Sequence, residues 1–231
     1  MDGRVLTKLE EWQRKAGAPP ELVEFYHRLL LRQAKAEERL GLPGVALTGE
    51  AASERLGRGL PLIRPDDLEL DWSLLREVFG EVVAAFADCP TLFGTVPGNL
   101  IGPGTSHLLL EEAVRAWFKG ERLPEAIVAG GISEHLLEVM IQGTLKPFLA
   151  GYSKALLGYV EQESWRRGYC PICGGNPDYA YLDKELGARW LLCHRCDTGW
   201  LFQRLQCPYC GSQDQNALAY YTDEFVPPLC L

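Results

Sequence analysis

The stretch CPICGGNPDYAYLDKELGARWLLCHRCDTGWLFQRLQCPYCG, residues 170–211, decides the fold of the C-terminal part of this chain. It holds six of the eight cysteines, arranged as three Cys-x-x-Cys pairs. A seventh, Cys230, stands next to the last residue, while residues 1–169 contain only Cys89. Clustered Cys-x-x-Cys pairs in a chain that opens without an apolar signal segment indicate metal or redox chemistry rather than disulfides.

The spacing within and between these pairs is that of a metal site. Two intervening residues let both thiolates of a pair reach one ion from a tight turn, here called a knuckle. Gly174 and Gly211 allow the backbone to curl past the sulfur and to hydrogen-bond it. Two knuckles make a tetrahedral four-sulfur site that suits Zn²⁺ or a single iron ion. The pattern C-x2-C-x19-C-x2-C thus predicts four ligands: Cys170, Cys173, Cys193 and Cys196.

An internal repeat predicts a second, incomplete site. CPICG at 170–174 recurs as CPYCG at 207–211, and nineteen residues separate Cys210 from Cys230, as they separate Cys173 from the next cysteine. By the same offset, Cys230 would open a pair closed at position 233, but the sequence ends at 231. The second site would then have three thiolates: Cys207, Cys210 and Cys230. An interleaved alternative joins the two CPxCG knuckles in one site, as the knuckles of rubredoxin are joined.

Residues 1–168 have the apolar periodicity of helices. One inward face is expected at Leu22, Phe25, Tyr26, Leu29 and Leu30, and another at Leu74, Leu75, Val78, Phe79, Val82, Val83 and Phe86. Asp71 is the expected N-cap of the second helix. Residues 40–65 are expected to form a loop with one short helix, and 106–119 a third helix. A fourth starts near Ser133, is kinked or split by Pro147, and resumes towards Trp165 with Gly168 as its stop.

From Tyr169 onward, the pattern changes to short β-prone segments between Cys-rich turns. These segments are 179–182, 189–192, 200–205 and 217–221. The fold class is therefore expected to be an all-α domain, residues 1–168, followed by tandem rubredoxin-like or zinc-ribbon subdomains at 169–206 and 207–231.

The remaining chemistry-bearing residues are weaker candidates. His194, inside the Cys193–Cys196 loop, is either a surrogate ligand or, preferably, an exposed loop residue. His27, His107 and His135 are isolated, and Cys89 is interpreted as a buried structural thiol. No GxGxxG, P-loop, HExxH or GxSxG pattern occurs, so nothing in the sequence indicates an enzyme.

Composition and hydropathy argue against two classes of function. The net charge is −8, and residues 165–231 carry six Lys or Arg against seven Asp or Glu, so a nucleic-acid-binding zinc ribbon is disfavoured. No run of about 18 apolar residues suggests a membrane span. A cytoplasmic protein without membrane insertion is expected.

Two segments carry a family resemblance. LKPFLAGYSKALLGYVEQESWRRGYCPICG (145–174) and RWLLCHRCDTGWLFQRLQCPYCG (189–211) resemble the FdhE family of formate dehydrogenase accessory proteins. The shared features are a Pro-Phe-Leu helix, a Trp-x-x-Gly lead into CPxCG, a Cys-x-x-Cys-x-Thr-x-Trp strand and a second CPxCG; GLPLI (59–63) fits more loosely. The chain departs from the family in its absent eighth cysteine and in Asp197, where a small residue usually stands.

The resemblance implies a function as well as a fold. It implies a helical domain followed by two rubredoxin-like metal subdomains, with iron associated with the cysteines. It also implies a cytoplasmic maturation factor that contacts the catalytic subunit of respiratory formate dehydrogenases before export by the twin-arginine route. By this resemblance, Cys230 matches the first cysteine of the family's fourth pair. A rubredoxin-like electron-transfer protein remains the main alternative, because an iron ion bound by four thiolates can carry one electron.

Overall fold

The structure, a computed structural model, describes residues 18–41, 43–98, 111–125, 131–183 and 185–214, with Thr7, Leu9, Glu11, Arg14 and Asn216 in addition. The chain divides into two compact units, each made of two separate stretches. The helical unit comprises Met1–Gly41 and Glu69–Phe148, and the ribbon unit comprises Leu42–Leu68 and Leu149–Leu231. These divisions do not coincide with the boundary predicted at residue 168, because a stretch far upstream of the cysteines belongs to their unit.

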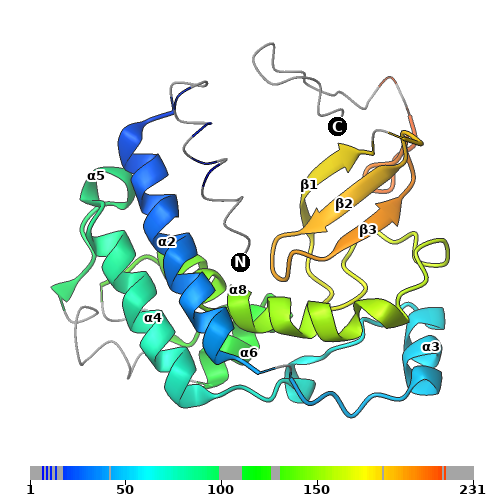
Figure 1. Ribbon diagram of the computed structural model, residues 1–231, viewed down its shortest axis with the longest axis horizontal. Helices are drawn as coiled ribbons and strands as arrows, with labels where there is room; N and C mark the ends of the chain where they lie inside the picture. The colour runs from blue at the N-terminus through cyan, green and yellow to red at the C-terminus, as the bar shows by residue number, and fades with distance from the viewer. Residues whose placement is uncertain are drawn as a thin grey trace. The chain divides into compact units, whose positions relative to one another are not determined.

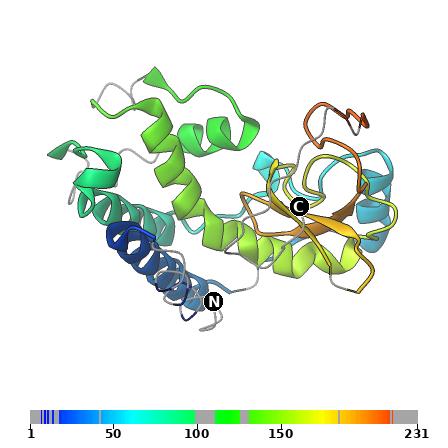
Figure 2. The same cartoon turned by 90° about the horizontal axis from the view of Figure 1, so that it is seen from above.

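The helical unit is built from α2 (Pro20–Arg39), α4 (Trp72–Ala87), α5 (Pro90–Phe93), α6 (Glu111–Lys119) and the first part of α8 (Glu134–Leu156). Helices α2 and α4 lie side by side in both views (Figures 1 and 2). Residues 106–110 of the predicted third helix lie outside the described residues, and its remainder is α6. The helical character predicted for this part of the chain is therefore confirmed.

Helix α4 forms as its sequence predicts. The carboxylate of Asp71 accepts hydrogen bonds from the backbone N–H groups of Ser73 and Leu74, each 3.0 Å long, and so caps the helix. All seven residues of the predicted inward face are buried: Leu74, Leu75, Val78, Phe79, Val82, Val83 and Phe86. On α2 the prediction is less accurate, since Tyr26 is 43% exposed while Gln33 is buried.

Pro147 does not split the fourth predicted helix, because α8 is continuous from Glu134 to Leu156. A proline lacks the N–H that would bond the carbonyl four residues earlier, here that of Gly143. That carbonyl instead accepts a hydrogen bond of 2.7 Å from Nε2 of the buried Gln33. A side chain from α2 thus satisfies the group that the proline leaves unpaired.

The predicted end of this helix, at Gly168, is wrong. The α-helix ends at Leu156, and a 3₁₀ turn, η4 (Leu157–Tyr159), follows it. Gly168 has a different role: a Cβ at this position would lie 2.0 Å from the carbonyl oxygen of Pro208. The glycine is therefore needed where the backbone of the last knuckle passes over it.

The ribbon unit contains α3 (Gly49–Gly57), η1 (Pro65–Asp67) and a three-stranded antiparallel sheet, β1 (Pro177–Leu182), β2 (Arg189–Cys193) and β3 (Gly199–Phe202). The strands neighbour one another in chain order (Figure 1). Three of the predicted strands are thereby confirmed, and the short helix expected within 40–65 is α3. The fourth predicted strand, 217–221, lies outside the described residues.

The stretch 42–68 joins the ribbon unit through main-chain hydrogen bonds. The N–H groups of Leu62 and Ile63 donate to the carbonyls of Pro171 and Ile172, both at 2.9 Å. The side chains of Leu62 and Ile63 are each 1% exposed. This segment therefore forms one wall of the first knuckle.

Among the described residues, no helix is both long enough and apolar enough to cross a membrane.

Candidate metal centre

The three Cys-x-x-Cys pairs adopt the same knuckle geometry. In each, the residue four positions after the first cysteine donates its N–H to that cysteine's carbonyl, at 2.9–3.2 Å. The N–H of the first cysteine donates to the carbonyl of the residue five positions after it, at 2.8–3.0 Å. The fourth residue after the first cysteine has a positive φ in all three knuckles: Gly174 at 72°, Asp197 at 56° and Gly211 at 73°. Asp197, the departure noted in the sequence, therefore takes a conformation that favours glycine.

Four of the sulfurs come together in one group. The Sγ atoms of Cys170, Cys173, Cys193 and Cys196 all lie within 4.8 Å of one another. Three of the Sγ–Sγ distances are 3.4–3.5 Å. This is the sequential arrangement of the knuckles rather than the interleaved one.

These distances fit a metal ion and exclude disulfides within the group. A disulfide requires a sulfur–sulfur distance of about 2.05 Å, and all four cysteines are free. Zinc–sulfur bonds of about 2.3 Å in a tetrahedron place the sulfurs about 3.8 Å apart. All four residues are buried, with 0–3% exposure, so the donor set is closed to solvent.

The crowded sulfurs perturb one another's protonation. Hydrogen bonds with the neighbouring sulfurs, first that of Cys170, and burial raise the pKa of Cys173 well above its ordinary value. The same kind of contact raises the pKa of Cys196. Hydrogen bonds from the surrounding thiols, Cys170 first, lower the pKa of Cys193 strongly. Such a cluster keeps thiol protons when no ion is bound, and binding of a divalent cation would release them.

Small residues leave room for this cluster. A Cβ at Gly175 would lie 3.0 Å from the sulfur of Cys193 and 2.9 Å from Cδ of Arg195. The N–H of Arg195 also points at the Cys193 sulfur, 3.4 Å away. Trp165 and Trp200, which flank the first two knuckles in sequence, are also buried, at 2% and 0% exposure. The residues present therefore fit a buried four-thiolate ion site.

Two hydroxyls that sequence reasoning did not single out adjoin the cluster. Thr198 Oγ1 is 3.0 Å from the sulfur of Cys196 and 2.7 Å from Ser153 Oγ. Thr198 was visible in the Cys-x-x-Cys-x-Thr motif, but nothing local in the sequence indicated Ser153, which is on α8.

The predicted second site is only partly described. Cys207 and Cys210 form a knuckle, with Cys210 exposed, and Cys230 lies outside the described residues. Backbone N–H groups of Cys210 and Tyr209 lower the pKa of Cys207, which favours its thiolate. The knuckle is attached to the sheet through Tyr209, whose hydroxyl donates to the carbonyl of Pro177 at 2.5 Å. Neither thiol belongs to the four-sulfur group.

None of the other described candidates belongs to the four-sulfur group. The ring of His194 hydrogen-bonds the carbonyl of Asn176 through Nδ1 at 2.7 Å and is not part of the sulfur group. His135 is exposed near Glu138, and His107 lies outside the described residues. Cys89 is buried, as expected of a structural thiol, and His27 is half-buried on α2.

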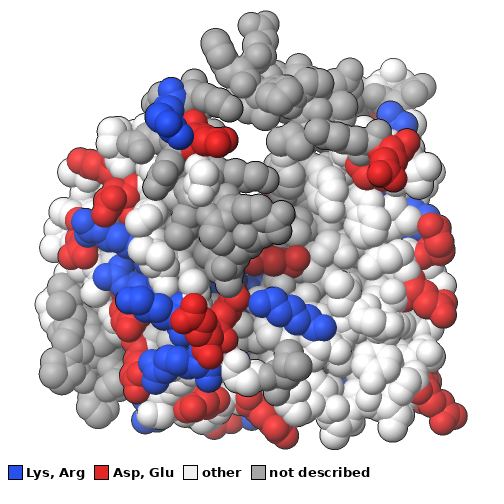
Figure 3. Space-filling view, in the orientation of Figure 1, with Lys and Arg blue, Asp and Glu red and all other residues white. Residues whose placement is uncertain are grey.

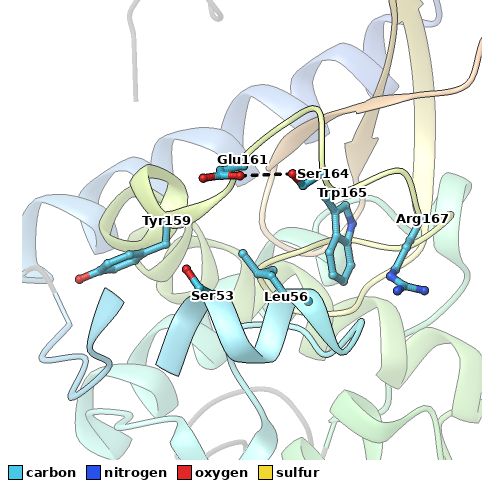
Figure 4. Close-up of a pocket in the computed structure, with 8 residues that line it drawn as sticks. Ser53, Leu56, Tyr159, Glu161, Ser164, Trp165 and Arg167 are labelled. Atoms are coloured by element: carbon cyan, nitrogen blue, oxygen red, sulfur yellow. Dashed lines mark hydrogen bonds between the residues drawn. The ribbon is translucent and has the colours of Figure 1, made fainter. Parts of the chain in front are cut away.

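A pocket of about 270 Å³ lies elsewhere in the ribbon unit. It is lined by α3 residues, including Ser53 and Leu56, and by the segment that runs from Tyr159 to Arg167. In Figure 4, Ser164 bonds Glu161 above the pocket, at 3.2 Å, and the Trp165 ring forms one wall. The lining mixes one acidic, one basic and several apolar groups. It contains no histidine or cysteine.

No protein-family model matches the chain. A curated FdhE homologue from Aquifex aeolicus is 35% identical over 102 residues, which cover 43% of this chain and 35% of the relative. One from Haemophilus ducreyi is 33% identical over 89 residues, covering 37% and 29%. The matches thus span about a third of the length of these relatives.

The fold has a counterpart among solved structures. The crystal structure of the FdhE protein from Pseudomonas aeruginosa aligns with a TM-score of 0.52 over 94% of this chain and 72% of that one. The sequence identity is 20%, so this likeness concerns the fold. The curated homologues confirm the resemblance that the cysteine motifs indicated: this chain is similar to FdhE proteins in part of its sequence, and its fold is similar to that of one of them.

Proposed function

We propose that the protein is a maturation factor that binds the catalytic subunit of a respiratory formate dehydrogenase and supports its assembly or activation in the cytoplasm before export. The observation that carries this proposal is the closed four-sulfur group in a chain related to the FdhE proteins. The four-sulfur group would be fully occupied by its ion, and the pocket at Tyr159 has no histidine or cysteine in its lining, so the action we propose is binding rather than catalysis.

The metal is proposed to be zinc or iron held by Cys170, Cys173, Cys193 and Cys196. Closed sites with four protein ligands are typical of structural metal. A ribbon with so small a sheet has little core, so an ion supplies much of its folding free energy. The ion would thereby maintain the surfaces that the partner recognises.

The last knuckle is proposed to belong to a second ribbon in tandem with the first, with Cys207, Cys210 and Cys230 as its thiolates. Its support is the knuckle geometry that the described pair shares with the first two pairs.

An anaerobic affinity purification from formate-grown cells tests the function. The bait is the full chain, and the bound proteins are identified by mass spectrometry. We expect a formate dehydrogenase catalytic subunit to dominate the bound fraction. A folded, metal-loaded bait that enriches no such subunit would contradict the proposal.

Electron transfer is the second candidate, because four sulfurs in this geometry can hold a single iron ion. Its test is a reversible one-electron couple on iron-loaded protein. Zinc in freshly isolated native material would argue against it. Nucleic-acid binding has less support: on the face shown in Figure 3, basic side chains are interspersed with acidic ones.

A further inference from the structure

Two buried hydroxyls connect helix α8 to the four-sulfur group. Thr198 Oγ1 lies 3.0 Å from Cys196 Sγ and 2.7 Å from Ser153 Oγ. Thr198 is 2% exposed and Ser153 7% exposed, so bulk water does not compete for these bonds. The backbone places Thr198 firmly, since its carbonyl accepts the N–H of Cys193 at 3.0 Å.

The direction of these hydrogen bonds follows from counting protons. Each hydroxyl has one hydrogen to donate, and a metal-bound thiolate has none. Thr198 must therefore donate to the sulfur of Cys196. The oxygen of Thr198 is then free to accept the hydrogen of Ser153. All the hydrogen bonds of this relay therefore point the same way: Ser153 donates to Thr198, and Thr198 donates to Cys196.

We propose that Ser153 and Thr198 are positioning residues of the metal centre, which hold the Cys196 sulfur and withdraw negative charge from it through this hydrogen-bond chain. The inference rests on the proposed metal site. Partners of this kind orient metal ligands, and removing one typically weakens metal affinity by about 10- to 100-fold. Hydrogen bonds to ligand sulfurs also shift the reduction potential of bound iron.

The experiment uses the full chain with Thr198→Val, which keeps the side chain's shape and removes the hydroxyl. Thr198→Ser, which keeps the hydroxyl, is the matched control. Zinc affinity is measured by competition with a chelator, and the sulfur-to-metal charge-transfer bands are recorded on Co²⁺-loaded protein. We expect Thr198→Val to bind zinc about 10-fold more weakly and to move the Co²⁺ bands to longer wavelength. Thr198→Ser should resemble the unmodified protein.

Ser153→Ala removes the first donor of the hydrogen-bond relay. It also provides an independent test if Thr198→Val fails to fold. It should shift both readouts in the same direction but less. In the Thr198→Val background it should change neither, because the connection is already broken. Unmoved bands and unchanged affinity in both variants would show that the hydroxyls only satisfy each other, and would overturn the inference.

Failure of the metal site itself gives a different result. If the unmodified protein binds neither zinc nor Co²⁺, the proposed site is wrong and the inference falls with it. If the unmodified protein binds both ions and the variants bind them equally, only the positioning role is overturned.

Discussion

The N–H of Leu62 donates a hydrogen bond of 2.9 Å to the carbonyl of Pro171, inside the first knuckle. A second bond, from Ile63 to Ile172, has the same length. Tyr169 adds a third connection, because its hydroxyl donates to the carbonyl of Gly59 at 2.7 Å. A segment before α4 thus depends on the cysteine turns that come more than a hundred residues later.

This dependence predicts which amides lose protection when the metal site is broken. In Cys173→Ser, or in chelated protein, the amides of Leu62 and Ile63 should exchange on the order of 100-fold faster. The amides of α4 should keep their protection, because α4 belongs to the other unit. Hydrogen exchange with peptide-level mass spectrometry measures both.

Cys89→Ser is the control for this experiment, since Cys89 is a buried thiol of the helical unit. It should leave the exchange of Leu62 and Ile63 unchanged. Full protection of these amides in metal-free Cys173→Ser would show that the knuckle folds without an ion.

The hydrogen bond from Gln33 to the Gly143 carbonyl is expected to stabilise the protein because Pro147 has no N–H to donate to that carbonyl. Gln33→Met removes the donor at similar volume and should lower the free energy of unfolding by about 1–3 kcal/mol. In Pro147→Ala the helix regains an N–H that can donate to this carbonyl. In that background, Gln33→Met should therefore lower the free energy of unfolding by less. Urea unfolding of the four proteins measures the difference, and equal costs in both backgrounds would refute the explanation.

Gly175 is expected to be required for the shape of the metal site. Gly175→Ala would place a methyl group 3.0 Å from the Cys193 sulfur and 2.9 Å from Arg195, so one of them must move. Zinc affinity should fall about 10-fold or more by analogy with other disturbed ligand surroundings. Gly158→Ala is the control, because a Cβ there meets nothing within 4 Å. If chelator competition gives equal affinities for the two variants, the cluster tolerates the methyl group.

Asp67 is expected to give the ribbon unit a pH-dependent stability. Its carboxylate accepts hydrogen bonds from the Arg64 backbone N–H at 2.9 Å and from the Arg55 side chain at 3.0 Å. Although burial opposes ionisation, the bonds from Arg64 and Arg55 lower the pKa of Asp67 below its ordinary value. A lowered folded-state pKa stabilises the protein above the unfolded pKa of about 3.9, and this contribution is lost as the pH falls below that value.

Asp67→Asn should therefore lower the free energy of unfolding by about 1–3 kcal/mol at neutral pH. The deficit relative to the unmodified protein should shrink as the pH is lowered towards about 3. Comparing the two proteins at each pH cancels the loss of metal in acid, which affects both. Asp178→Asn, at an exposed position of β1, is the control and should show no such deficit. A deficit independent of pH would mean that the carboxylate charge is not what stabilises this segment.

Features that depend on neighbours in sequence were predictable. The inward face of α4 follows from apolar spacing, and its cap from one aspartate next to it. The knuckles follow from two-residue spacing, because a four-residue turn determines where both sulfurs point. The sequential pairing of the first two knuckles also has a local cause, since β1 and β2 form the hairpin that brings them together.

The misjudged features depend on contacts between distant residues. The sequence suggests that Gly168 ends a helix, whereas in the structure this position must be glycine because the Pro208 carbonyl oxygen would lie 2.0 Å from a Cβ. The sequence suggests that Pro147 interrupts the helix, whereas in the structure Gln33 donates a hydrogen bond to the carbonyl that the proline leaves unpaired. Tyr26 has inward spacing but is 43% exposed in the described part of the chain.

The sequence by itself determined the helical first part, three strands of the ribbon unit, the cysteine turns and the resemblance to FdhE proteins, because periodicity and Cys-x-x-Cys spacing are encoded within a few residues. Only the tertiary structure decided that residues 42–68 belong with the cysteines and that Ser153 reaches Cys196 through Thr198. Main-chain bonds and buried hydroxyl contacts of this kind join residues of ordinary type across long separations. They are selected by packing and by the need to pair every buried polar group, which no local pattern records.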